Sequence, residues 1–225
     1  MNPRALALGV LTILSATSAA AYATPTGGTI TLYDSFTGNT GQGHNGPSTS
    51  PTVTEVAQAF TGQNVTLNSV ALALSADTTS DGGSLTVYLI ANNSAFDATG
   101  SLAGATTLGT ISDSSLTTTG GTRPALTTVS LGSTPSLSAG QEYWIVVNDT
   151  GASSFQWWYG NNVAGTGTSG QLSANNGGGW GTYDPTTFGA GGYGLTVTGV
   201  PEPATIAILG VGLAGLGFAR RRRAV

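Results

Sequence analysis

The run Glu142-Tyr143-Trp144-Ile145-Val146-Val147-Asn148 decides the fold. The alternate side chains that begin with Tyr143 are apolar, and so are Trp144 and Val146 between them, so both faces of an extended chain here are apolar. Aromatic and β-branched residues favour strands. A near-continuous apolar run of this length is typical of a strand that is covered on both faces. We therefore expect residues 142–148 to form a central strand.

Other short apolar runs extend this pattern in both directions along the chain. In 84–91, Leu85, Val87 and Leu89 share one face with Ala91, and the opposite face carries Tyr88 among others, which predicts one buried and one half-covered face. Gly, Asn, Asp and Pro separate the runs, as turns require. The candidate strands are 29–36, 53–61, 65–74, 84–91, 106–111, 126–131, 142–148, 153–160 and 193–198. About nine or ten short strands at this spacing predict an all-β body, an antiparallel β-sandwich or jelly roll.

Composition limits what this body can do. Only 7% of residues are charged, and cysteine is absent, which excludes disulfides, thiol catalysis and cysteine-ligated metals. There is no lysine, and Arg123 is the only basic residue of the body, which carries nine acids. This net charge of about −8 offers no basic surface for phosphate backbones, so we expect no nucleic-acid partner.

The N-terminus, 1–23, has the order of features of a secretory signal peptide. Arg4 supplies the positive charge, residues 5–14 form a short apolar helix-forming run, and Ala21-Tyr22-Ala23 supplies the small residues that a signal peptidase accepts. We expect cleavage after Ala23. The alternative is a buried N-terminal helix, which the ordered set of three features disfavours.

The C-terminus, 200–225, forms a second signal. Pro201-Glu202-Pro203 precedes an uncharged segment, 204–219, and the cluster Arg220, Arg221, Arg222 and Arg223 follows it. The 17 residues from Pro203 to Ala219 span roughly 26 Å as a helix, near the lower limit for crossing a bilayer. The arginines place this end on the cytoplasmic side, as Arg4 does for the other. We expect one transmembrane helix, with the body of 24–199 across the membrane; the alternative is a buried core helix.

The tail resembles a PEP-CTERM sorting signal in its Pro-Glu-Pro motif, glycine-rich apolar segment and terminal arginine cluster. The resemblance implies processing by an exosortase in a Gram-negative envelope. It also implies association with exopolysaccharide or biofilm, and eventual delivery to the cell surface or the extracellular matrix. It covers about 25 residues and says nothing about the body.

The body is similar to the choice-of-anchor extracellular domains, and most of all to the R type. The similar stretches are Ala57-Gln58-Ala59-Phe60-Thr61, 65–70, 137–147 and Phe155-Gln156-Trp157. This resemblance, which runs from about Val53 to Thr198, implies a β-sandwich surface domain without catalytic residues to carry over.

The polar residues form no catalytic constellation, so we expect no enzyme. His44, the only histidine, lies in a glycine-rich loop without a Gly-x-Ser-x-Gly motif nearby. The dispersed acids show no pair of the kind that a glycosidase needs. We expect no cofactor; Asp77 and Asp81 before Gly82 suit a calcium loop, although ordinary turn chemistry explains them equally well.

Aromatic residues are concentrated between 155 and 193, and two interpretations apply to them. Phe155, Trp157 and Tyr159 share one face and suit a core. Trp158, which the pleat places on the opposite face, and Trp180, in a glycine-rich loop, are candidate exposed contacts for a glycan. The sequence therefore predicts a non-enzymatic surface or matrix protein, with a carbohydrate-binding module as the alternative.

Overall fold

The computed structural model describes residues 28–36, 55–76, 83–92, 102–117, 124–149, 155–160, 168–175, 180–183 and 192–202; for 168–175 and 180–183 it describes the strands but not the side chains. The described chain is all-β, with antiparallel pairing throughout its strand pairs and one 3-10 turn, η1 (Asp113–Ser115). The predicted terminal helices fall outside these residues.

The larger sheet has six strands, and β9 lies at its centre. Its order is β12-β11-β2-β9-β5-β6. The strands are β2 (Glu55–Thr61), β5 (Ser84–Ala91), β6 (Thr106–Ser112), β9 (Glu142–Asp149), β11 (Thr168–Asn175) and β12 (Trp180–Tyr183). The prediction that 142–148 form a central strand is confirmed, because β9 pairs with β2 on one side and with β5 on the other.

The second sheet has five strands, and a two-stranded ribbon, β10-β4, lies beside the sheets. In the five-stranded sheet β13 lies between β1 and β3, and β7 and β8 both pair with β3. The bounds are β1 (Ile30–Asp34), β3 (Val65–Leu72), β4 (Leu74–Ala76), β7 (Thr127–Thr128), β8 (Ser136–Leu137), β10 (Phe155–Trp157) and β13 (Leu195–Pro201).

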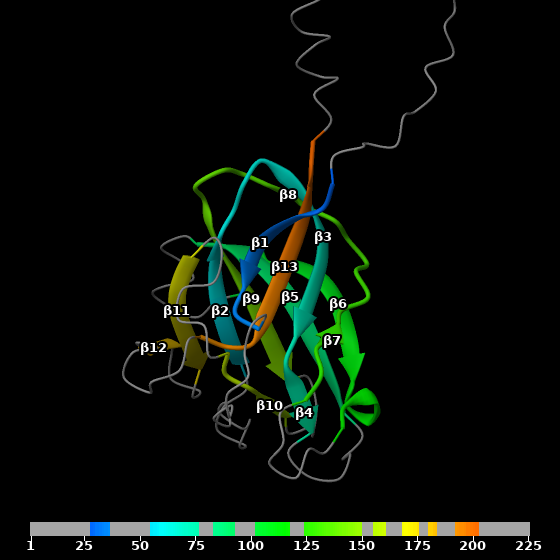
Figure 1. The fold of residues 1–225 in the computed structure, drawn as a ribbon. Helices are drawn as coiled ribbons and strands as arrows, with labels where there is room; N and C mark the ends of the chain where they lie inside the picture. The colour runs from blue at the N-terminus through cyan, green and yellow to red at the C-terminus, as the bar shows by residue number, and fades with distance from the viewer. Residues whose placement is uncertain are drawn as a thin grey trace, which may run out of the picture.

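The two sheets face each other across one hydrophobic core, as Figure 1 shows with β1, β13 and β3 in front of β2, β9 and β5. Alternate side chains of β3 and β13 point inward, among them Leu67 and Val197, and meet Phe60, Ile145 and Val87 of the larger sheet. Alternation with period two delivers one apolar side chain in two to the core, which is why these runs form a sandwich.

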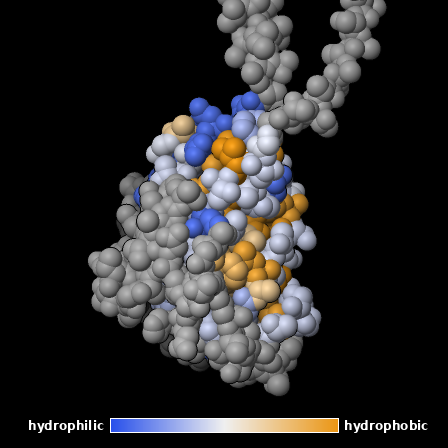
Figure 2. All heavy atoms as spheres, in the orientation of Figure 1, coloured by the Kyte–Doolittle hydropathy of each residue, from blue (hydrophilic) through white to orange (hydrophobic). Residues whose placement is uncertain are grey.

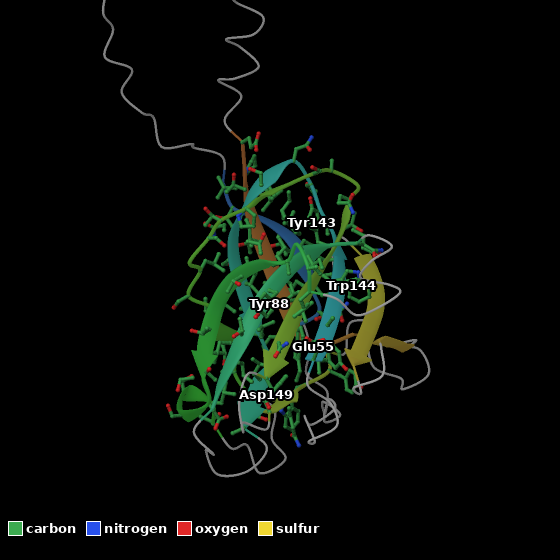
Figure 3. The ribbon with its side chains drawn as sticks, turned by 180° about the vertical axis from the view of Figure 1, so that it is seen from behind. Glu55, Tyr88, Tyr143, Trp144 and Asp149 are labelled. Carbon is green, nitrogen blue, oxygen red and sulfur yellow. The ribbon has the colours of Figure 1, made fainter. Side chains whose placement is uncertain are left out.

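The larger sheet also buries apolar side chains on its outer face. Trp144 and Val146 of β9 and Ile90 of β5 belong to a second cluster, against which Tyr88 and Leu102 pack. Figure 3 shows Tyr88 and Trp144 on this side of the ribbon. The continuous apolar run of β9 is thus explained, because its two sets of alternate residues enter two different clusters.

The structure extends the predicted set of strands. The 84–91 strand matches β5 at both ends, and its inner residues Leu85, Val87 and Leu89 are buried, as predicted. Strands β8, β11 and β12 had no predicted counterpart. β8 has only two residues and β12 only four, and β11 consists mainly of Gly, Ser, Thr and Asn, so none of them has an apolar periodicity to detect.

Candidate sorting site

Strand β13 carries the beginning of the C-terminal tail. Leu195 and Val197 anchor it in the core, and it pairs with β3 as far as Pro201, which lies opposite Val65. Proline has no N–H to donate to a ladder, so it does not suit the interior of a central strand, and here it is the last residue of β13. The strand thus continues past the predicted end at Thr198 and includes the first proline of the Pro-Glu-Pro motif.

Gly199 lies close to the Val65 side chain of β3. The register shifts between Thr198 and Gly199, so the ladder is irregular at this step. A Cβ atom on Gly199 would lie 2.5 Å from Cγ2 of Val65 and 3.0 Å from its Cβ. No side chain fits at that distance, so the close approach of the two strands requires glycine here.

The start of the described body lies beside its end. Ile30 of β1 pairs with Gly199 of β13, and Thr31 pairs with Thr198. Figure 1 shows both strands reaching the same end of the sandwich. The chain segments that precede and follow the described body therefore leave it from neighbouring positions.

A buried serine fixes β1 against β13. The Ser35 hydroxyl donates to the carbonyl oxygen of Tyr193 over 2.5 Å and accepts the N–H of Leu195 at 2.9 Å. Next to it, burial raises the pKa of Tyr33 to about 12; a hydrogen bond with Ser35 acts against this shift, and the nearby Asp34 carboxylate adds to it. The role of Ser35 could not be predicted from the sequence, because nothing in its neighbourhood distinguishes it from the many other serines.

The sorting residues divide between described and undescribed parts of the chain. Pro201 is partly buried and Glu202 is exposed, so the acidic residue of the motif lies outside the folded sheet. Pro203, the apolar segment 204–219 and Arg220, Arg221, Arg222 and Arg223 lie outside the described residues, as do Ala21 and Ala23 of the predicted cleavage site. Within the ranges that the structure describes, no helix has the length and hydrophobicity to cross a membrane.

Residues 199–223 match the family model of the PEP-CTERM protein-sorting motif. The chain carries this sorting motif. The match begins inside β13 and extends through the arginine cluster. It implies an exported protein that an exosortase processes and whose C-terminus carries a membrane-anchoring sorting signal. No curated protein and no solved structure matches the chain. The similarity of the body to choice-of-anchor domains stays a prediction.

Trp158 is buried, and its prediction as an exposed contact is wrong. Only 1% of its surface is exposed, and its Nε1 donates to the Ser75 hydroxyl over 2.7 Å. The prediction assumed one strand from 153 to 160 with a solvent face. β10 instead ends at Trp157, and beyond it the backbone N–H of Trp158 donates to Ala73 while its carbonyl accepts from Gly194. The residue is therefore tied to neighbouring segments on both sides of its backbone, and its indole is inside the fold.

The second predicted contact, Trp180, is the first residue of β12 and does not lie in a loop. Its side chain lies outside the described set. Phe155, Trp157 and Tyr159 belong to the core or pack against it, as predicted. Phe155 and Trp157 are fully buried, and the ring of Tyr193 stacks between Trp157, at 4.9 Å, and the partly buried Tyr159, at 5.1 Å.

Two acids lie at the end of the larger sheet far from the tail, as Figure 3 shows for Glu55 and Asp149. Glu55 lies opposite Asn148, whose amide donates to the Glu55 carboxylate over 2.6 Å. Because neighbours on a strand point to opposite faces, Asp149 does not share the face of Glu55. These two acids therefore do not form the paired carboxylates of a glycosidase.

In the described part of the chain, no three His, Cys, Asp or Glu residues lie close enough together to hold a metal ion. The proposed calcium loop with Asp77 and Asp81, and also His44, lie outside the described residues.

Proposed function

We propose that this chain is a non-enzymatic protein of the cell surface or extracellular matrix, associated with exopolysaccharide, that an exosortase releases from the inner membrane. One observation supports it above the others: the sorting motif begins in the last residues of β13, and Glu202 is exposed directly after the sheet. A processing enzyme can reach the chain from Glu202 onward without unfolding the body.

The position of the two ends supports the proposed route. Arg4 and the arginine cluster assign both ends to the cytoplasmic side. In the described body, the start of the first strand lies beside the end of the last, with Ile30 opposite Gly199. Both chain ends can therefore reach the same membrane face without any change in the fold. During export the leader and the tail both attach the body to the membrane, at two adjacent points of the fold. After removal of the leader, the tail is the remaining attachment.

The proposed matrix role does not depend on exposed tryptophans. The glycan-binding alternative used Trp158 and Trp180, and the burial of Trp158 removes the first of them. What supports a matrix role is the sorting motif together with an acidic body that is rich in uncharged polar residues. Such a body stays hydrated in an extracellular polymer without depending on lysine or on disulfides.

The experiment is a comparison of two variants in a host that has an exosortase. In the first, Pro201, Glu202 and Pro203 are all replaced by alanine; in the control, the exposed Ser136 at the same end of the body is replaced by alanine. We expect the control to lose the arginine cluster by intact mass and to reach the surface or medium. The motif variant is expected to keep its tail and to remain in the membrane fraction. Equal processing of both variants would contradict the proposed role of the motif, and a processed body that does not co-purify with exopolysaccharide would contradict the matrix assignment.

A further inference from the structure

One end of the sandwich is formed by the strand ends next to the tail, and we call it the exit pole. It comprises the end of β13 at Pro201, the start of β1 at Ile30, the start of β3 at Val65 and the end of β8 at Leu137, which pairs with Val65. Apart from Glu202 of the sorting motif, the exposed described side chains that we assign to it are uncharged and polar or small: Thr29, Thr31, Gln63, Asn64, Ser136 and Ala139. Figure 2 shows hydrophilic residues at this end of the molecule.

The acids of the described body lie mostly away from the exit pole. Asp149 follows Glu142 by seven positions along β9, about 24 Å at the rise of an antiparallel strand. Glu55 lies opposite Asn148 at that same far end. Asp113 lies there too, because it follows Ser112 of β6, which pairs with Ser84 at the start of β5. Asp34 lies opposite Thr196, five residues or about 17 Å from Pro201.

Two acids remain near the exit pole. The carboxylate of Glu142 is partly buried and accepts the Asn92 amide at 2.5 Å. Glu202 belongs to the sorting motif itself. Among the described residues, the exit pole therefore exposes one carboxylate, that of Glu202, which lies just beyond the end of β13. The body as a whole is strongly acidic.

The tail leaves little distance between this pole and the membrane. Only Glu202 and Pro203 separate the end of β13 from the apolar segment 204–219. Two extended residues span about 7 Å. If 204–219 lie in the bilayer, this short connection holds the exit pole close to the lipid headgroups.

We propose that the exit pole rests on the lipid headgroups of the membrane while the tail is anchored; this inference depends on the proposed anchoring. The charge distribution fits the contact. Acids at 17 to 24 Å from the pole are about two or three Debye lengths away at physiological salt, so their repulsion by anionic lipids is screened. The uncharged polar side chains at the pole form hydrogen bonds with headgroups without a charge penalty.

The test uses the cysteine-free chain, in which a single introduced cysteine gives one labelling site. Gln63→Cys and Ser136→Cys place a fluorophore at the exit pole, and Thr117→Cys places it at the far end after η1; all three residues are exposed. The full chain is reconstituted into vesicles of phosphatidylethanolamine and phosphatidylglycerol that contain a headgroup-linked nitroxide quencher. We expect several-fold stronger quenching at both pole positions than at position 117.

The outcomes separate the two claims. Flotation of the chain with the vesicles, together with equal quenching at all three positions, overturns the docking and leaves the anchor intact. Failure to float overturns the anchor, and the docking with it. Unchanged thermal unfolding of each labelled variant confirms that the label has not disturbed the fold.

Discussion

Ile30 and Gly199 lie opposite each other across β1 and β13, so the described body begins and ends at one point. Gly199 is also the first residue of the sorting-motif match. The motif is therefore joined to the folded sheet without a linker, and changes at this junction are expected to affect both stability and sorting.

Replacement of Gly199 by alanine tests this junction. The added Cβ would lie 2.5 Å from Val65 Cγ2, so the strands must separate. Overpacking of this kind costs about 1–3 kcal/mol. Urea unfolding followed by tryptophan fluorescence measures the loss. Gly28→Ala is the control, because a Cβ there has no atom within 4 Å; equal stability of both variants would contradict the close approach.

Replacement of Ile145 by aspartate tests the central strand. Ile145 is fully buried on β9 between β2 and β5, and an unpaired charge there is far too costly to bury. We expect no soluble folded protein. Thr110→Asp, at an exposed position of β6, is the matched control and is expected to unfold within about 0.5 kcal/mol of the parent. Circular dichroism and thermal melts compare the two.

The buried pair Trp158 and Ser75 gives a third prediction. Trp158→Phe leaves the Ser75 hydroxyl without its indole donor, and we expect a loss of roughly 1–3 kcal/mol. A double-mutant cycle with Ser75→Ala should show that the two effects are not additive, since both changes remove one hydrogen bond. Additive effects would show that the bond contributes nothing. Retention of folded Trp158→Phe on matrix polysaccharide is expected to equal that of the parent, because the indole is buried.

Tyr33 predicts a loss of stability at high pH. Its folded pKa of about 12 lies above the value near 10 of an unfolded tyrosine. The neutral form is therefore favoured by folding, so this contribution is complete below pH 10 and is lost as the pH rises toward 12. The loss is about 2–3 kcal/mol. Urea unfolding at pH 8 to 11.5 measures it, and Tyr33→Phe should flatten the alkaline decline; an equal decline in the variant would assign it to other groups.

The sequence predicts those strands of the sandwich that carry an alternating or continuous apolar pattern. β5 and β9 are recognisable because Leu85, Val87, Ile145 and Val147 supply the period, and their bounds agree to within a residue. β11 escapes prediction because its Thr-Ser-Gly-Gln-Leu-Ser-Ala-Asn sequence has almost no apolar side chains. Its place in the sheet comes from pairing with β2, a long-range contact that no local pattern encodes.

The candidate site shows the same division. The Pro-Glu-Pro motif is local, so its presence could be predicted from the sequence. The opposition of Gly199 and Ile30, the close approach to Val65 and the serine contact at Ser35 join residues far apart in the chain. The Trp158 error has the same origin, because alternation along a strand indicates which side chains share a face but not whether that face is covered.

The place of β13 between β1 and β3 also has a mechanical consequence. A pull on the tail acts along the strand axis and loads the seven-residue pairing with β3 in shear, so its hydrogen bonds resist together. A force that separates the two chain ends would instead open β1 from β13 like a zipper, one pair at a time, beginning at Ile30 and Gly199. If the predicted leader is cut, only the first kind of load remains, and we expect the pairing with β3 to resist traction on the tail.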